Sequence, residues 1–207
     1  MDHDMNFWDQ QFATTEFKYG TDANQFLRQQ ATQLPPGARV LLPGDGEGRN
    51  SVWLAQQGFE VTAMDSSRVG LDKAQRLAEQ KGVRIETIHA DLADWVPTPA
   101  SVDAVVLTFV HLPEALRATV HQRLVRALRP GGRLILEAFH PLQLGKPSGG
   151  PKVAAMLYTL DLLRGDLQAA LQSDLKEVLG WEGEDQLNEG PGHQGLAHLT
   201  RFVLQQG

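Results

Sequence analysis

Segments rich in apolar and β-branched residues alternate with helix-type patterns over most of the chain. Where four to eight such residues run together, the pattern is typical of a strand buried on both faces. These runs lie at 39–42, 60–64, 83–88, 102–109 and 133–139. Between them, apolar residues recur three and four positions apart, and Gly58, Gly82 and Pro113 stand where helices would end or begin. Five strands separated by helices predict a doubly wound, mostly parallel α/β sheet with helices on both faces.

The two ends of the chain carry different patterns. Residues 1–36 predict a helical lead-in, in which Thr21 or Asp22 caps a helix that ends before two prolines. Near the other end, one helix is expected to carry four apolar residues at helical spacing: Met156, Leu160, Leu163 and Leu167. Two extended segments follow at 175–187 and 196–204, and the Gly-Pro-Gly turn between them predicts an antiparallel hairpin at the sheet edge, which brings the sheet to seven strands.

Composition narrows the class of protein. The chain has 207 residues, 42% of them hydrophobic and 21% charged, which suits one domain with a substantial core. We expect that domain to comprise the lead-in at 1–36, a cofactor-binding core at 37–140 and a C-terminal helix and hairpin at 141–207. A formal net charge of −6 without a basic run argues against binding to nucleic acid or to an anionic membrane. The chain has no cysteine, and its seven histidines lack the paired spacing of a metal site, so no metal is expected.

A glycine-rich loop follows the first predicted strand. Its sequence, Gly44-Asp-Gly-Glu-Gly48, leads into a predicted helix whose free N–H groups suit a bound ligand. A dinucleotide site of the G-x-G-x-x-G type would need glycine at position 49, where the chain has Arg49. The acids Asp45 and Glu47 would also repel a pyrophosphate, whereas they would attract a cationic ligand. The loop therefore favours a nucleoside with an amine and a sulfonium over a dinucleotide.

Acidic residues also follow the second and third predicted strands. In a doubly wound sheet, ligands bind beyond the carboxyl ends of the strands. Asp65 is suited to accept hydrogen bonds from both hydroxyls of an adenosine ribose, and Asp91 from an exocyclic amine, with Leu92 on the adenine face. Each acid alone is also explained as a cap or turn residue before a helix, with Ser66 or Ser67 sharing the cap. The loop and the two acids at three successive strand ends are more specific together than any one of them.

These motifs resemble those of class I S-adenosylmethionine-dependent methyltransferases over nearly the whole chain. The similar segments are 40–50, 61–65, 89–92 and 128–136. The lead-in, with Phe7-Trp8 and Tyr19-Gly20, is similar to that of the tellurite-resistance-type and thiopurine-type branch, where it helps cover the site. The resemblance implies a Rossmann-like fold and S-adenosylmethionine (SAM) as the cofactor. Pro43 and Asp45 depart from the usual residues of the family's loop, which affects the expected binding of the methionine end.

The resemblance and the strand-end positions together yield three sets of candidate site residues. Ten are expected to contact the cofactor: Gly44, Asp45, Gly46, Gly48, Asn50, Asp65, Ser66, Asp91, Leu92 and Thr108. Six are expected to line the acceptor chamber: Tyr19, Asn24, Phe109, Glu137, His140 and His193. His111 is the candidate to take a proton from the acceptor or to orient it. A purely structural role stays open for three of these residues. His111 would bridge a helix and a strand, His193 would be a solvated turn residue, and Glu137 would pair with a nearby arginine.

The predicted function is methyl transfer from SAM to a small molecule by a monomer or homodimer. Two alternatives share features of the cofactor site. A non-catalytic SAM-binding module would lack only the acceptor chamber, and a nicotinamide-dependent oxidoreductase is disfavoured by the missing glycine at position 49. Because the acidic start of the chain has no basic segment followed by an apolar run, we expect no signal peptide and a cytoplasmic location.

Overall fold

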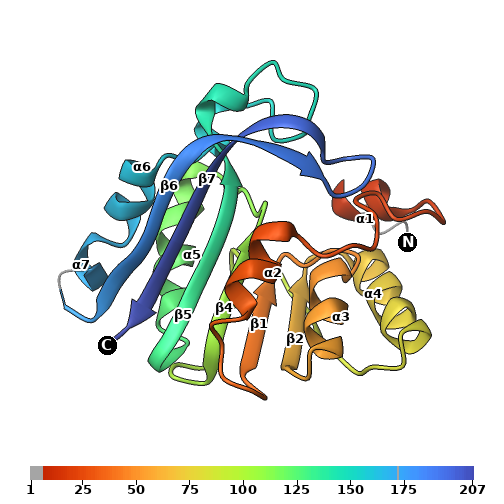
Figure 1. Cartoon of the computed structure of the whole chain (residues 1–207), viewed down its shortest axis with the longest axis horizontal. Coiled ribbons are helices and arrows are strands. Elements are labelled where there is room, and N and C mark those ends of the chain that lie inside the picture. The colour runs from red at the N-terminus through yellow and green to blue at the C-terminus, as the bar shows by residue number, and fades with distance from the viewer. Residues whose placement is uncertain (1–6, 172) are drawn as a thin grey trace.

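The computed structural model describes residues 7–171 and 173–207, which form a seven-stranded mixed sheet with helices on both faces (Figure 1). The strands lie in the order β3-β2-β1-β4-β5-β7-β6. Their bounds are β1 Arg39–Pro43, β2 Glu60–Asp65, β3 Glu86–His89, β4 Val102–Thr108, β5 Leu128–Phe139, β6 Leu175–Asn188 and β7 Gln194–Gln206. Strands β1 to β5 pair in parallel, whereas β7 pairs antiparallel with β5 and β6. The predicted doubly wound sheet with a C-terminal hairpin is confirmed.

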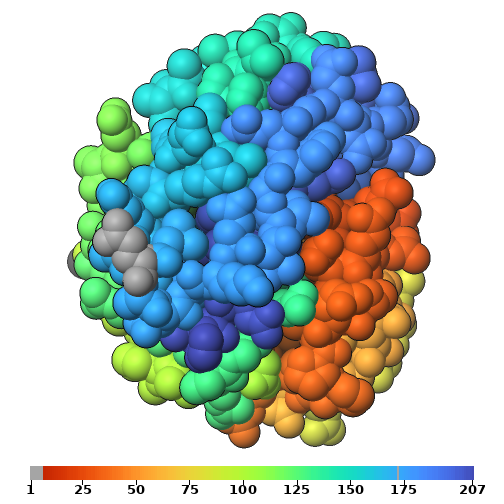
Figure 2. Space-filling view, turned by 60° about the vertical axis from the view of Figure 1, so that its left-hand side comes forward, coloured from red at the N-terminus to blue at the C-terminus, as the bar shows by residue number. Residues whose placement is uncertain are grey.

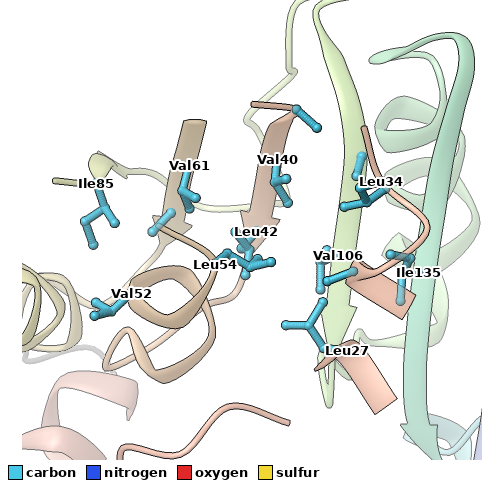
Figure 3. Close-up of a cluster of buried hydrophobic side chains, with 14 of the residues drawn as sticks. Leu27, Leu34, Val40, Leu42, Val52, Leu54, Val61, Ile85, Val106 and Ile135 are labelled. Atoms are coloured by element: carbon cyan, nitrogen blue, oxygen red, sulfur yellow. The ribbon is translucent and has the colours of Figure 1, made fainter. Parts of the chain in front are cut away.

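The helices pack on the sheet through two separate hydrophobic cores. Their bounds are α1 Phe7–Phe12, α2 Gln25–Ala31, α3 Arg49–Gln56, α4 Arg68–Gln80, α5 Glu114–Val125, α6 Leu160–Asp166 and α7 Gln168–Leu171, with 3₁₀ helices η1 Pro141–Gln143 and η2 Ala154–Met156. Side chains alternate between the faces of a strand, so Leu42 of β1 packs with α2, α3 and α4, while Leu41 packs with α5 and α6. Figure 3 shows the first core, with Leu27 of α2 and Leu54 of α3 on the face that carries Leu42 and Val106.

The lead-in helix begins later than its sequence pattern predicts. Neither Thr21 nor Asp22 is the cap; Asn24 is, because its side chain accepts a hydrogen bond from the backbone N–H of Leu27 at 2.7 Å. The helix also ends at Ala31, so Leu34 reaches the core from a turn. Similarly, β3 begins at Glu86 and not at Val83, since the Val83 backbone N–H still bonds a carbonyl of the preceding helix.

The single helix predicted across residues 156–167 is wrong. Met156 ends η2, and α6 begins only at Leu160. Between them Tyr158 is fully buried, and its backbone N–H donates to the carbonyl of Phe139 at the end of β5 (3.0 Å). This pairing holds the chain extended for two residues, after which the Thr159 side chain caps α6.

The carboxyl ends of β1 to β5 share one edge of the sheet, and two remote parts of the chain close over it. In Figure 1 the β6–β7 hairpin (blue) curves over this edge toward the N-terminal segment (red). Figure 2 shows the part of the chain that follows this segment (orange) lying directly against the C-terminal strands (blue). The approach is close: a Cβ atom on Gly190, which has a φ of +104°, would lie 2.6 Å from the Tyr19 carbonyl. In the described ranges, no helix is both long and apolar enough to span a membrane.

Candidate active site

A cavity of about 740 Å³ lies beyond the carboxyl ends of the parallel strands. This volume is in the range that holds a small ligand or cofactor. The cavity wall includes nine of the ten predicted cofactor contacts, all except Gly48, as well as His111. Of the six predicted acceptor contacts it includes Tyr19, Phe109 and His193. The strand-end rule therefore predicted residues that share one cavity, and their contacts with a cofactor or an acceptor stay predictions.

The glycine loop has the tight backbone expected of a ligand-binding turn. Gly44 and Gly46 have φ angles of +70° and +63°, which L-residues with side chains rarely adopt. The Gly44 N–H donates to the carbonyl of Met64 at 2.7 Å, which ties the loop to β2. Gly48 serves a different purpose, because a Cβ there would lie 2.5 Å from the Cβ of Ala74. Glycine at 48 allows α3 and α4 to pack closely, and the structure does not place it on the cavity wall.

Asp65, the last residue of β2, is held rigidly at the cavity wall. Its Oδ2 accepts a hydrogen bond from the Gly46 N–H and its Oδ1 from the Ser67 N–H, both at 2.8 Å. Burial raises the pKa of the carboxyl, and the hydrogen bonds from Ser67 and Gly46 oppose that shift. The cap of α4 is Ser67, whose hydroxyl accepts from Gly70. Each Asp65 oxygen retains acceptor capacity, so binding to ribose hydroxyls stays a prediction that the geometry permits.

Asp91 and Leu92 line the cavity beyond β3. Asp91 Oδ1 accepts a hydrogen bond from the Ala93 backbone N–H at 2.8 Å, so the turn-forming interpretation of this residue is confirmed. The same side chain also lies on the cavity wall, which means that the turn and a contact with an exocyclic amine are compatible.

The two acids of the loop differ in their partners. Glu47 forms a buried ion pair with Lys73 and accepts a hydrogen bond from the Lys18 backbone N–H at 2.8 Å. Asp45 accepts from the Ser51 hydroxyl through Oδ2, whereas its buried Oδ1 has no partner within the described residues. Burial raises the pKa of Asp45 to about 7. Of these two acids, only Asp45 therefore has an oxygen without a partner among the described residues, although both acids line the cavity.

His111 bridges three parts of the fold. Its Nδ1 lies 2.5 Å from the carbonyl of Met156, and its Nε2 accepts from the Phe139 backbone N–H at 3.3 Å. This arrangement fixes the neutral tautomer with the proton on Nδ1. Burial also lowers the pKa of His111 to about 4. Since both ring nitrogens are engaged by the backbone, the geometry favours the structural bridge over a proton acceptor.

Four rings form a continuous aromatic wall on the β4–β5 side of the cavity. Tyr19 comes from the lead-in, Phe109 follows β4, Phe139 ends β5, and His193 lies in the hairpin turn. The ring centroids are 4.4 Å apart for Tyr19 and His193, 4.4 Å for His193 and Phe109, and 4.5 Å for Phe109 and Phe139. His193 is only 6% exposed, so it is not a solvated turn residue. Phe139 was missed from the sequence, although it occupies a strand end like the others.

The remaining acceptor candidates, Asn24, Glu137 and His140, are not on the cavity wall. Asn24 is fully buried and donates hydrogen bonds from Nδ2 to Glu137 and Glu189. Glu137 also forms an ion pair with Arg201 at 2.6 Å, which confirms the arginine interpretation of this carboxylate. His140 caps η1 by accepting from the Leu142 N–H at 3.1 Å. The polar atoms of these three side chains are therefore bonded to residues of other elements.

Glu189 and Arg49 form a buried ion pair at 2.8 Å beside the cavity. Glu189 also accepts from the backbone N–H of Gln25 at 3.1 Å, so the hairpin turn is fastened to the start of α2. Nothing in the local sequence around either residue indicated this pair, since the partners are 140 positions apart. In the described part of the chain, no group of three or more histidine, aspartate and glutamate side chains is arranged to hold a metal ion.

The fold and the strand-end cavity define a doubly wound α/β protein suited to an adenosine-containing ligand. Residues 40–132 match a family model described as a methyltransferase domain. The chain is 35% identical over 178 residues to the demethylmenaquinone methyltransferase of Clavibacter sepedonicus, a match covering 83% of this chain and 70% of that one. It is 27% identical over 157 residues to the thiopurine S-methyltransferase of Vibrio cholerae serotype O1 (strain M66-2), covering 68% and 72%.

One more sequence relative and one solved structure match this chain over different shares of its length. Over 107 residues the chain is 37% identical to the tRNA 5-carboxymethoxyuridine methyltransferase of Escherichia coli K12, and it spans only 40% of that relative's length. The crystal structure of TehB from Haemophilus influenzae shares the fold, with a TM-score of 0.70 and 17% identity over 97% of this chain and 66% of that one. The chain belongs to the class I SAM-dependent methyltransferase family.

Proposed function

We propose that this protein transfers a methyl group from SAM to a small-molecule acceptor. One observation carries the proposal: one cavity contains three groups of residues, which are suited to bind the nucleoside of SAM, the methionine end of SAM and the methyl acceptor. Asp65 and Asp91 lie at its β2–β3 end, Asp45 with its unpartnered oxygen lies at the loop after β1, and the aromatic wall lies at its β4–β5 side.

The residues present suit the cofactor of the family. Asp65 would accept from the ribose hydroxyls, while Asp91 and Leu92 would contact the adenine. The unpartnered Oδ1 of Asp45 would receive the ammonium group of the methionine end, which relieves the cost of leaving that oxygen unpaired. When bound, SAM supplies a sulfonium whose methyl group is already electrophilic.

The work left to the chain is alignment and exclusion of water. The lead-in contributes Phe12 and Tyr19 to the cavity wall, and the hairpin contributes His193. These segments are held together by the contacts of Asn24 and Glu189, so the cover over the strand ends is built into the fold. No proton acceptor is required where the acceptor atom is already anionic or carries a free lone pair.

Charge and similarity favour a small acceptor over a nucleic acid. The formal net charge is −6, which opposes binding to a phosphate backbone. The two relatives matched over about 70% of their length are named for a quinone and a thiopurine, whereas the one named for tRNA is matched over 40% of its length. The experiment must therefore distinguish transfer to a small molecule from the alternative, transfer to tRNA.

The test uses methyl-labelled SAM with a panel of thiols, phenols, purine thiols, metalloid oxyanions and carboxylic acids, and with bulk tRNA in a separate arm. We expect label in a small molecule together with an equal amount of demethylated cofactor, S-adenosylhomocysteine (SAH). Asp65→Ala is the control, because it should strongly reduce labelling at SAM concentrations that just saturate the wild type. Label in tRNA alone would overturn the small-molecule acceptor. Tight SAM binding without transfer to any arm would favour a non-catalytic SAM-binding module.

A further inference from the structure

The aromatic wall offers a stacking surface and hardly any buried charge. Its four rings, Tyr19, His193, Phe109 and Phe139, follow one another at centroid distances of 4.4 to 4.5 Å. Arg49, the buried guanidinium beside this wall, is already paired with Glu189. Lys18 and Lys152 also line the cavity, but neither is fully buried. Among the described residues, a small oxyanion would therefore find no unpaired cation that is fully buried beside the wall, whereas a flat ring would gain stacking contacts.

Two members of the wall are polar, Tyr19 and His193, and His193 is the more deeply buried of the two. The His193 side chain is buried, and no hydrogen bond joins either ring nitrogen to a residue that the structure describes. Nδ1 is enclosed by the protein, so Nε2 is the nitrogen that a molecule in the cavity could reach. Burial and the nearby charge of Arg49 lower the pKa of His193 to about 3, so the ring is neutral at physiological pH. A neutral imidazole has one N–H donor and one lone pair, and leaving both unpaired in a protein interior is costly.

Phe109 is held in a conformation that packing alone would not select. Its φ angle is +56°, in the left-handed region that residues other than glycine rarely occupy. The backbone N–H of Phe109 donates to the Glu137 carbonyl at 2.8 Å, which fixes this strained turn directly after β4. Such strain is typical of functional sites, and here it turns the ring toward His193.

We propose that the methyl acceptor is a flat aromatic molecule that stacks on this wall and exchanges a hydrogen bond with the neutral imidazole of His193. This inference rests on the proposed function and names the acceptor class for it. It assigns His193, and not His111, as the residue that binds and orients the acceptor. The difference lies in the partners, because both nitrogens of His111 are bonded to the backbone.

The test measures binding to the SAH-loaded protein by calorimetry, so that the probes do not compete for the adenine site. The probes are 2-naphthol, its saturated twin decahydro-2-naphthol, and naphthalene, which lacks the hydroxyl group. We expect 2-naphthol to bind at least tenfold more tightly than decahydro-2-naphthol. We also expect His193→Phe, which keeps a ring in the stack, to weaken 2-naphthol binding about tenfold and to leave naphthalene binding unchanged.

A matched control and a fold check accompany the variant. His198→Phe changes a histidine of the same hairpin that does not line the cavity, and it should leave all three affinities unchanged. His193→Phe should retain the wild-type melting temperature, since it removes an unpaired polar group without removing the ring. In ¹⁵N-histidine spectra, the His193 ring signals, identified with this variant, should shift on addition of 2-naphthol.

The outcomes separate the two proposals. Equal binding of the aromatic probe and its saturated twin, or equal loss of 2-naphthol and naphthalene binding in His193→Phe, would overturn the inference and leave methyl transfer intact. Failure of the wild-type protein to bind SAH would overturn the proposed function and the inference with it.

Discussion

Single residues in this cavity differ mainly in what already occupies their polar atoms. Asp65 and Glu47 are held by neighbours, whereas Asp45 keeps a buried oxygen without a partner among the described residues. The same contrast separates His111, whose two ring nitrogens are both bonded, from His193, whose ring nitrogens have no hydrogen-bond partner in residues 7–171 and 173–207. Unused hydrogen-bonding capacity is therefore what sets Asp45 and His193 apart from these other polar side chains.

Replacing Asp65 by Ala should weaken SAM binding by about 2–3 kcal/mol, because the ribose would lose a charged acceptor. The protein should also lose stability, since the N–H groups of Gly46 and Ser67 lose their partner. Ser67→Ala is the control: it removes the cap of α4, costs about 1 kcal/mol of stability and should leave SAM affinity nearly intact. Calorimetric titration and denaturant unfolding of both variants give the comparison. Near-normal affinity in Asp65→Ala would limit this residue to a local structural role.

Asp45 should make stability and SAM binding respond oppositely to pH. An unfolded aspartate has a pKa near 3.9, and the folded value is raised to about 7. The folded state therefore holds a proton that the unfolded state lacks, so the contribution of Asp45 to the free energy of unfolding falls as the pH rises from about 4 to 7. A bound ammonium favours the carboxylate, so SAM affinity should rise between pH 6 and 7.5. Denaturant unfolding and calorimetric titration across this range measure the two responses.

The neutral variant Asp45→Asn isolates this effect. It should lose both pH dependences, and it should bind SAM more weakly than the wild type at pH 7.5. If the variant showed the same pH dependence of SAM affinity as the wild type, another group would be responsible.

At the scale of elements, the cover over the site is fastened by one asparagine. Asn24 caps α2 through its carbonyl oxygen and donates from its amide nitrogen to Glu137 of β5 and Glu189 of the hairpin turn. Three elements far apart in the sequence are thus joined at a single buried side chain. The arrangement explains how the lead-in and the hairpin bring Tyr19 and His193 into contact.

Asn24→Ala should lower the free energy of unfolding by about 3 kcal/mol or more, because the helix loses its cap and two buried carboxylates lose a donor. Asn24→Asp keeps a capping oxygen but adds a third carboxylate, so it should be less stable than Asn24→Ala at neutral pH and recover as the pH falls. Gln25→Ala is the control, since this exposed side chain can be removed while its backbone N–H still bonds Glu189. Denaturant unfolding at pH 5 and pH 7.5 distinguishes them. Equal stability of the Ala and Asp variants at both values would contradict the shared role.

At the scale of the whole molecule, the strand order sets which residues can meet. Because β1 lies between β2 and β4, the loop after β1 is central, with Asp65 and Asp91 on one side and Phe109 and Phe139 on the other. Parallel pairing brings all of these strand ends to one edge. The antiparallel hairpin lies beside β5, and its turn curves over these strand ends to cover them.

SAM and SAH should each stabilise the folded protein, whereas NAD and NADP should not. A ligand that binds only the folded state adds about 2.7 kcal/mol at a concentration of 100 times its Kd. For a chain of this size, that corresponds to a rise in melting temperature of roughly 5–10 °C. Thermal unfolding at increasing ligand concentration measures the effect. A rise with NAD and none with SAM would contradict the assignment of the cofactor site.

The sequence by itself determined the alternation of strands and helices, the hairpin and the loop after β1. These features depend on local causes: alternating burial on a strand, helical spacing, and glycines at positions such as 44 and 46 that require a positive φ. Because ligands of doubly wound sheets bind at strand ends, the sequence alone could also place Asp65, Asp91 and Phe109 at the edge where the cavity lies.

Tertiary structure decided what each polar side chain is free to do. Asn24, Glu137 and Glu189 meet across 165 positions, and no local pattern records such a pairing. The glycine at 48 is required by α4, and the continuous helix expected before Tyr158 is broken by a bond to β5. Hydrogen-bond partners depend on distances in space. Only the folded chain therefore reveals that both nitrogens of His111 are bonded and that His193 has no hydrogen-bond partner in the part of the chain that the structure describes.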